Sequence, residues 1–169
     1  MNVIIHDLET EQFQMLFPHL NQDTQIIYDN GKIKHCIGCF GCWIKTPGTC
    51  VIKDGYEHIG AILAKANDVT IISQCLYGGY SPFIKNIFDR SISYVLPFFK
   101  TVKGETHHQP RYPNQYRLFV YFYGDNILSQ EKLTAQKLVE ANSNNFNVSQ
   151  YTVSFYNSIN DLSKEVTLS

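Results

Sequence analysis

Four of the five cysteines lie on a short, glycine-bearing segment, where their spacing is C-x2-C-x2-C-x7-C. They are Cys36, Cys39, Cys42 and Cys50. An odd number of cysteines in a chain that starts without a secretory signal favours thiols or metal ligands over a disulfide framework. Four thiolates at this spacing could ligate a [4Fe-4S] cluster or a tetrahedral zinc ion. Alternatively, they remain reduced thiols that pack the loop or take part in redox exchange.

Length and composition predict a single compact domain over residues 1–169, because 169 residues with 44% hydrophobic content can bury one sizeable core. Fourteen basic and fifteen acidic side chains give a net charge of −1 without a basic block, which argues against a nucleic-acid partner. No stretch approaches the roughly 18 apolar residues of a membrane span. We therefore expect a soluble, cytoplasmic protein without membrane insertion.

Hydrophobic periodicity predicts five short strands that alternate with helical segments. This alternation indicates a doubly wound α/β fold, with a five-stranded parallel sheet in the order 2-1-3-4-5 and helices on both faces. In this order, ligands bind at the carboxyl ends of strands one, three and four. The predicted strands cover residues 2–5, 25–28, 69–72, 117–122 and 146–155, and the predicted helices start near Thr10, Ile59, Pro82 and Gln130.

Several local features accompany this pattern. Pro18 should end the first helix, and Ser81 followed by Pro82 is typical of a capped helix start. Lys85, Asp89 and Arg90 are expected to be charges on a helix face, with an i,i+4 pair between the first two. Residues 94–114 look irregular and long for a connection, which is typical of a functional loop. Trp43, Tyr94, Phe98 and Phe99 are expected to cover a ligand, form a subunit contact or close the end of the core.

Two segments resemble the NAD(P)H-dependent FMN reductase family of the flavodoxin superfamily, including its iron–sulfur flavoproteins. One is the cysteine segment, Cys36–Cys42 with Cys50–Asp54. The other is Ser73–Arg90, which is similar to the family pattern P-x-Y-x-G-x-x-S-x-x-x-K-x-x-x-D-R. The resemblance implies a flavodoxin-like fold, FMN as cofactor, NAD(P)H and a small electron acceptor such as a quinone or free flavin as partners, and a homodimer. It also implies cluster ligation by the four cysteines.

The resemblance further implies which residues contact the flavin. The isoalloxazine ring would lie against Gln74, Cys75, Leu76, Tyr77, Gly78, Gly79 and Ser81, with Tyr123 and Gly124 on its other side. Glycines permit such close approach of main chain to a ring, although Gly78 and Gly79 also suit an ordinary tight turn, and Cys75 suits a small buried position. No catalytic side chain is expected, because the redox chemistry belongs to the cofactor.

The first loop departs from the family pattern. Residues 6–11 read His-Asp-Leu-Glu-Thr-Glu, with three carboxylates and no glycine. A phosphate needs free amides, hydroxyls and positive potential, so only Thr10 suits it here, and His6 only if protonated. Arg111 or Arg117 could replace the lost groups. Two alternatives to the reductase therefore stay open: a non-catalytic binding or regulatory module, and an electron-transfer protein with FMN and a [4Fe-4S] cluster.

Overall fold

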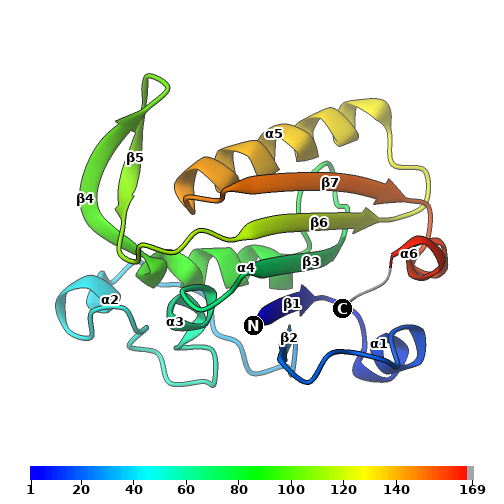
Figure 1. Cartoon of the computed structure of the whole chain (residues 1–169), viewed down its shortest axis with the longest axis horizontal. Helices are drawn as coiled ribbons and strands as arrows, with labels where there is room; N and C mark the ends of the chain where they lie inside the picture. The colour runs from blue at the N-terminus through cyan, green and yellow to red at the C-terminus, as the bar shows by residue number, and fades with distance from the viewer. Residues whose placement is uncertain (167–169) are drawn as a thin grey trace.

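Five parallel strands form the central sheet of the computed structural model, which describes residues 1–166 (Figure 1). The order is β2-β1-β3-β6-β7, which confirms the predicted flavodoxin-like topology. Parallel registers such as Val3 opposite Val69 bring the carboxyl ends of β1, β3 and β6 to one edge. The strands are β1 (Asn2–His6), β2 (Thr24–Tyr28), β3 (Asp68–Gln74), β6 (Arg117–Tyr123) and β7 (Gln150–Tyr156).

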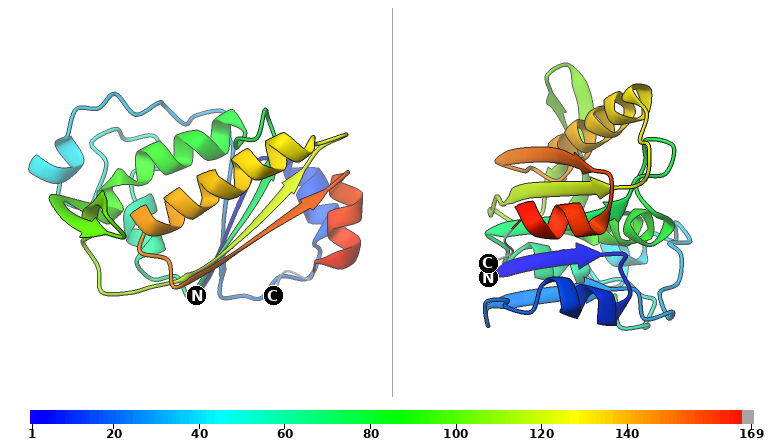
Figure 2. Two further views of the ribbon diagram at one scale, coloured as in Figure 1. Left: turned by 90° about the horizontal axis from the view of Figure 1, so that it is seen from above. Right: turned by 90° about the vertical axis from the view of Figure 1, so that its right-hand side faces the viewer.

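Helices cover both faces of the sheet, as predicted (Figure 2). Alternate side chains of a strand point to opposite faces, so Val3 and Ile5 pack in one core cluster and Ile4 in the other. The first cluster lies under α3 (Ile59–Leu63), α4 (Pro82–Arg90) and α5 (Ser129–Asn145). The second lies under α1 (Thr10–Leu16) and α6 (Ile159–Glu165). None of the described helices is long and apolar enough to cross a bilayer.

Element boundaries differ from the predicted ones where backbone contacts decide them. Helix α1 ends at Leu16, before Pro18, as expected. Helix α5 continues to Asn145, and the Phe146 amide bonds to the Asn142 carbonyl, so β7 starts at Gln150 instead of residue 146. The Ser81 side chain does not cap α4, and its own amide donates to the Ser73 hydroxyl instead. Helix α6 was not predicted.

The stretch predicted to be irregular is an antiparallel hairpin, which corrects that expectation. Strands β4 (Val95–Val102) and β5 (Glu105–Pro110) pair and project beyond the sheet, following the short helix η1 (Ser91–Tyr94) (Figure 1). Lys103 and Gly104 connect them, both with positive φ, which matches the twist of a two-residue hairpin turn. The sequence pattern did not predict this hairpin, because Pro97 within β4 and a turn without the usual Asn-Gly pair are not typical of one.

The aromatic residues of this region have different environments. Tyr94 is buried in the core, so a role as a ligand lid or subunit contact is wrong for this side chain. Trp43, from the short helix α2 (Gly41–Ile44), donates its indole N–H to the Val95 carbonyl and attaches α2 to the hairpin. Phe98 and Phe99 are 61% and 63% exposed. Phe98 and Phe99 thus remain available to a partner, and the half-buried Trp43 lines a cavity.

Candidate functional site

The two loops predicted to contact a planar ligand lie side by side at the carboxyl edge of the sheet. One follows β3 and contains residues 74–81, and the other follows β6 and starts at Tyr123. The Cys75 amide donates to the Tyr123 carbonyl at 2.9 Å. Gly124 lies so near that a Cβ on it would be 3.8 Å from the Cys75 carbonyl oxygen. The structure thus brings together the two halves of the predicted ring site.

The tip of the loop after β3 is a closed tight turn. Leu76 and Gly79 exchange two backbone hydrogen bonds, of 3.0 and 2.8 Å, while Tyr77 and Gly78 at the tip both have positive φ. A Cβ on Gly78 would lie 2.7 Å from the Glu131 carbonyl oxygen on α5, so only glycine fits. The Tyr77 side chain is 92% exposed. The turn holds an aromatic ring in solvent at the carboxyl end of β3.

Cys75 and Ser81 occupy the two ends of this turn. Burial raises the pKa of the Cys75 thiol, and a hydrogen bond from Gly78 offsets only part of this shift, so the thiol stays protonated at neutral pH. Ser81 is buried at the start of α4. Cys75 is therefore a half-buried, neutral thiol next to the turn.

Asp7 joins the three strand ends at this edge, a role that the sequence analysis missed. One carboxylate oxygen accepts the Gln74 amide at 2.8 Å, and the other accepts the Tyr123 hydroxyl at 3.0 Å. Burial raises the pKa of Asp7, while polar groups of Ser81, Gln74 and Tyr123 offset part of that shift. Burial and the neighbouring Asp7 carboxylate also raise the pKa of Tyr123. The available sequence signal was an acidic residue directly after the first strand.

The remaining residues of the first loop do not form an anion site. Glu9 stands at the N-cap of α1 and Glu11 in its first turn, and the helix has only seven residues. Thr10 opens onto a separate hollow of about 360 Å³ between α1 and β2, lined also by Phe13 and His6. Arg111 and Arg117, the expected substitutes, bond to the Ser93 carbonyl and Asp68, so neither serves this loop.

His6 is held as a neutral, buried ring. It is 1% exposed and stacks on Phe13 with ring centroids 3.9 Å apart. Burial lowers its pKa to about 4, and a hydrogen bond with the Leu8 backbone offsets only part of this effect. His6 therefore carries no charge near neutral pH and does not compensate the three carboxylates.

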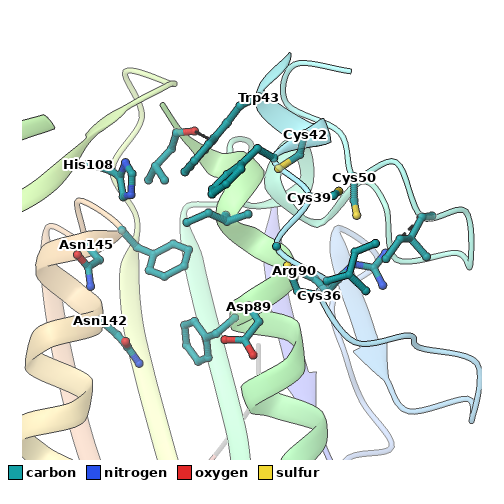
Figure 3. A pocket seen from close by; sticks show the side chains of 18 residues that line it. Cys36, Cys39, Cys42, Trp43, Cys50, Asp89, Arg90, His108, Asn142 and Asn145 are labelled. Carbon is teal, nitrogen blue, oxygen red and sulfur yellow. Dashed lines mark hydrogen bonds between the residues drawn. The ribbon is translucent and has the colours of Figure 1, made fainter. Parts of the chain in front are cut away.

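The four clustered cysteines line a second cavity, of about 490 Å³, away from the ring loops (Figure 3). Helix α4 links the two places: its first turn follows the ring loop, and Arg90 at its end lines the cysteine cavity. Nine residues of helix span about 13 Å. Aromatic and polar side chains complete the lining, among them Trp43, Phe88, Phe146, His108, Asn142 and Asn145.

The cysteines differ in exposure within this cavity. Cys36 and Cys39 are exposed, and Cys42 and Cys50 are buried. Burial raises the pKa of Cys42, and the neighbouring Cys50, Cys36 and Cys39 raise it further. In residues 1–166, no three His, Cys, Asp or Glu side chains are grouped closely enough to hold a single metal ion. The arrangement in the described residues therefore supports neither the zinc site nor the [4Fe-4S] cluster.

Arg90 anchors the cysteine segment, which corrects its expected place on an exposed helix face. Its side chain is 0% exposed and pairs with Asp54 through two bonds of 2.7 and 2.9 Å. It also donates to the Lys34 and Ile52 carbonyls, and Cys50 lies against its guanidinium. The hydrogen bond with Arg90 lowers the pKa of Asp54 to about 2. The predicted Lys85–Asp89 pair does form, at 2.6 Å.

Comparison with known proteins identifies the fold. No protein-family profile matches the chain, and no curated protein does. Among solved structures, the Trp repressor binding protein from Bacillus subtilis has 16% identity and a TM-score of 0.50, over 98% of this chain and 92% of the other. An FMN-dependent NADH-azoreductase from Bacillus anthracis, in complex with FMN, has 12% identity and a TM-score of 0.52, over 91% and 85%.

An NADPH-quinone reductase from P. pentosaceus is also similar, with 14% identity and a TM-score of 0.53 over 92% of this chain and 82% of the other. At these identities, the likeness establishes the flavodoxin-like fold alone. Two of these three neighbours are thus described as an FMN-dependent NADH-azoreductase and an NADPH-quinone reductase.

The neutral state of His6 predicts an acid-sensitive contribution to stability. Below pH 6.5 the unfolded chain binds a proton at this histidine, and the folded chain does so only near pH 4. The free energy of unfolding should therefore fall by about 2 kcal/mol between pH 7.5 and 5 through this residue alone. Urea unfolding of wild type and His6→Phe at both pH values measures the difference. Equal pH dependence in the two proteins would contradict this assignment.

Proposed function

We propose that this protein is a flavin-dependent oxidoreductase of the NAD(P)H-dependent FMN reductase type, which passes electrons to a quinone or a similar small acceptor. The observation that carries the proposal is the meeting of the two ring loops at the carboxyl ends of β3 and β6. Ligands of open α/β sheets bind outside the carboxyl ends of the strands, and in this strand order the switch point lies between β1 and the adjacent β3. The functions named for proteins of the same fold support the same reaction class.

The ring end of a flavin fits the residues at this edge. Tyr77 offers an exposed ring at the tip of the first loop, and Gly124 of the second loop lies near the Cys75 carbonyl oxygen, whereas Gly78 packs against α5. A bound flavin would supply the capacity to accept a hydride from NAD(P)H and to pass two electrons to the acceptor. The residues proposed to hold and orient its ring are Gln74, Cys75, Leu76, Tyr77, Gly78, Gly79, Ser81, Tyr123 and Gly124.

The phosphate end of FMN does not fit the first loop. Asp7, Glu9 and Glu11 carry negative charge there, and Thr10 is the single hydroxyl among residues 6–11. A dianionic phosphate at a helix start needs free amides and positive potential. The proposal therefore rests on the ring site.

A second candidate is electron transfer through a [4Fe-4S] cluster at the cysteine cavity, for which the cysteines would have to move together, because in the described residues they are not grouped closely enough to hold a metal. All four cysteines line a single cavity, and the buried Arg90 lies against Cys50, with its Nε atom lacking a hydrogen-bond partner. Cluster thiolates accept hydrogen bonds of this kind, which tune the reduction potential. The residues proposed to ligate the cluster are Cys36, Cys39, Cys42 and Cys50.

We also propose that the protein forms a homodimer through the β4–β5 hairpin. Phe98 and Phe99 are exposed there, and Phe40 and Ile44 of the cysteine segment are exposed too. Large exposed apolar side chains that gather on one part of a surface typically mark interaction sites. Sedimentation equilibrium should give twice the monomer mass, and Phe98→Asp with Phe99→Asp should give the monomer. A monomeric wild-type protein at micromolar concentration would refute this assembly.

The exposed Tyr77 ring predicts a specific loss of flavin binding. Tyr77→Ala should weaken binding about 3- to 10-fold, because aromatic stacking contributes about 0.5–1.5 kcal/mol beyond area burial. Stability should stay unchanged, because the side chain is solvent-exposed and the substitution keeps the same backbone strain. Flavin fluorescence titration measures the affinity. Tyr77→Phe should bind as wild type, and the remote Tyr151→Ala is the matched control.

The cluster candidate predicts four iron and four labile sulfide per chain after anaerobic purification or reconstitution. Cys42→Ser and Cys50→Ser should each lose the brown chromophore, whereas Cys75→Ser should keep it, because Cys75 lies in the ring loop. Iron analysis, sulfide analysis and visible absorption provide the measurement. Iron-free protein after anaerobic reconstitution would leave the four residues as reduced thiols.

A further inference from the structure

We propose that the ring site selects a flavin without a phosphate monoester, of the riboflavin class, over FMN. This inference rests on the proposed function and specifies its ligand. It comes from the disagreement between a ring site that fits a flavin and a first loop that does not fit its phosphate.

Two hydrogen-bond donors at the carboxyl edge of the sheet already bond to a carboxylate of the protein itself. In the structure, the Gln74 amide and the Tyr123 hydroxyl both donate to Asp7, at 2.8 and 3.0 Å. The Gln74 amide lies at the end of β3 and the Tyr123 hydroxyl at the end of β6, so both could otherwise donate to an anion bound at this edge. The half-buried Asp7 carboxylate thus occupies both donors and repels a phosphate brought to this edge, because water screens its charge only partly.

The start of α1 adds further repulsion. Glu9 is the N-cap and Glu11 lies in the first turn, so carboxylates already compensate the positive end of this short helix. The Glu9 side chain accepts no capping hydrogen bond from the amides at the start of α1. An incoming phosphate would meet two more negative charges here and would find only Thr10 as a hydroxyl donor.

Basic side chains do not offset this charge. The groups that act on Asp7 include no lysine or arginine, and His6 is neutral near pH 7. Lys85 pairs with Asp89, and Arg117 pairs with Asp68 at the opposite edge of the sheet. Lys132 lies over the Phe155 ring, and its charge lowers the pKa of Cys75 in the loop after β3. A neutral ribityl chain avoids the whole conflict, because its hydroxyls can donate to the carboxylates.

The test is a fluorescence titration of the purified full chain with riboflavin, FMN and lumiflavin. We expect riboflavin to bind at least about tenfold more tightly than FMN at low salt, with lumiflavin showing the contribution of the ring alone. Salt should narrow the difference only partly, because Asp7 is less screened than Glu9 and Glu11.

Charge-neutral variants locate the cause. Asp7→Asn should improve FMN binding about tenfold relative to riboflavin, since the amide keeps an acceptor for the Gln74 amide and removes the charge. Glu140→Gln removes one negative charge at an exposed position in the second half of α5, and it should leave the ratio of FMN to riboflavin affinity unchanged. Where Asp7→Asn does not fold, the double variant Glu9→Gln with Glu11→Gln should improve FMN binding by a smaller, salt-sensitive factor.

Two results would overturn the inference in different ways. FMN binding tighter than riboflavin binding would refute the proposed selectivity, while the flavin-dependent function would stand. If Lys132→Gln then lost the tighter binding of FMN, Lys132 would be the cation that holds the phosphate. No binding of riboflavin, FMN or lumiflavin would refute the proposed function and this inference together.

Discussion

Parallel pairing of β1, β3 and β6 gathers three strand ends at one edge, and the polar groups there need partners that a neighbouring strand no longer provides. Asp7 meets this requirement for two strands at once, because its carboxylate accepts the Gln74 amide and the Tyr123 hydroxyl. The bonds fix the start of both ring loops. They also place a negative charge at this edge of the sheet.

Helix α4 connects this edge with the cysteine cavity. Its start follows the tight turn of Tyr77 and Gly78, and its last residue is the buried Arg90. A buried guanidinium is costly unless its charge is paired, and Asp54 with two main-chain carbonyls of the cysteine segment provides the partners. One helix therefore positions a ring site at its first turn and a thiol-lined cavity at its last.

The loop after β3 and the first loop, after β1, offer different chemistry at the same edge of the sheet. The loop after β3 presents the exposed Tyr77 ring and has Gly78 where α5 leaves no room for a Cβ. The first loop keeps a hydroxyl at Thr10 but surrounds it with carboxylates and a neutral His6. The two features lie at different strand ends, since Tyr77 follows β3 and Thr10 follows β1.

The sequence by itself determined the sheet order, the helix starts at Thr10 and Pro82, and the Lys85–Asp89 pair, because these follow from local periodicity and i,i+4 spacing. It also indicated that the ring loops belong together, since parallel strands end at one edge. Tertiary structure alone decided that Arg90 is buried against Asp54, that Asp7 bonds to two distant strands, and that residues 95–110 form a hairpin. Each of these depends on contacts between segments far apart in the chain, whose free energy of burial and hydrogen bonding exceeds any local preference.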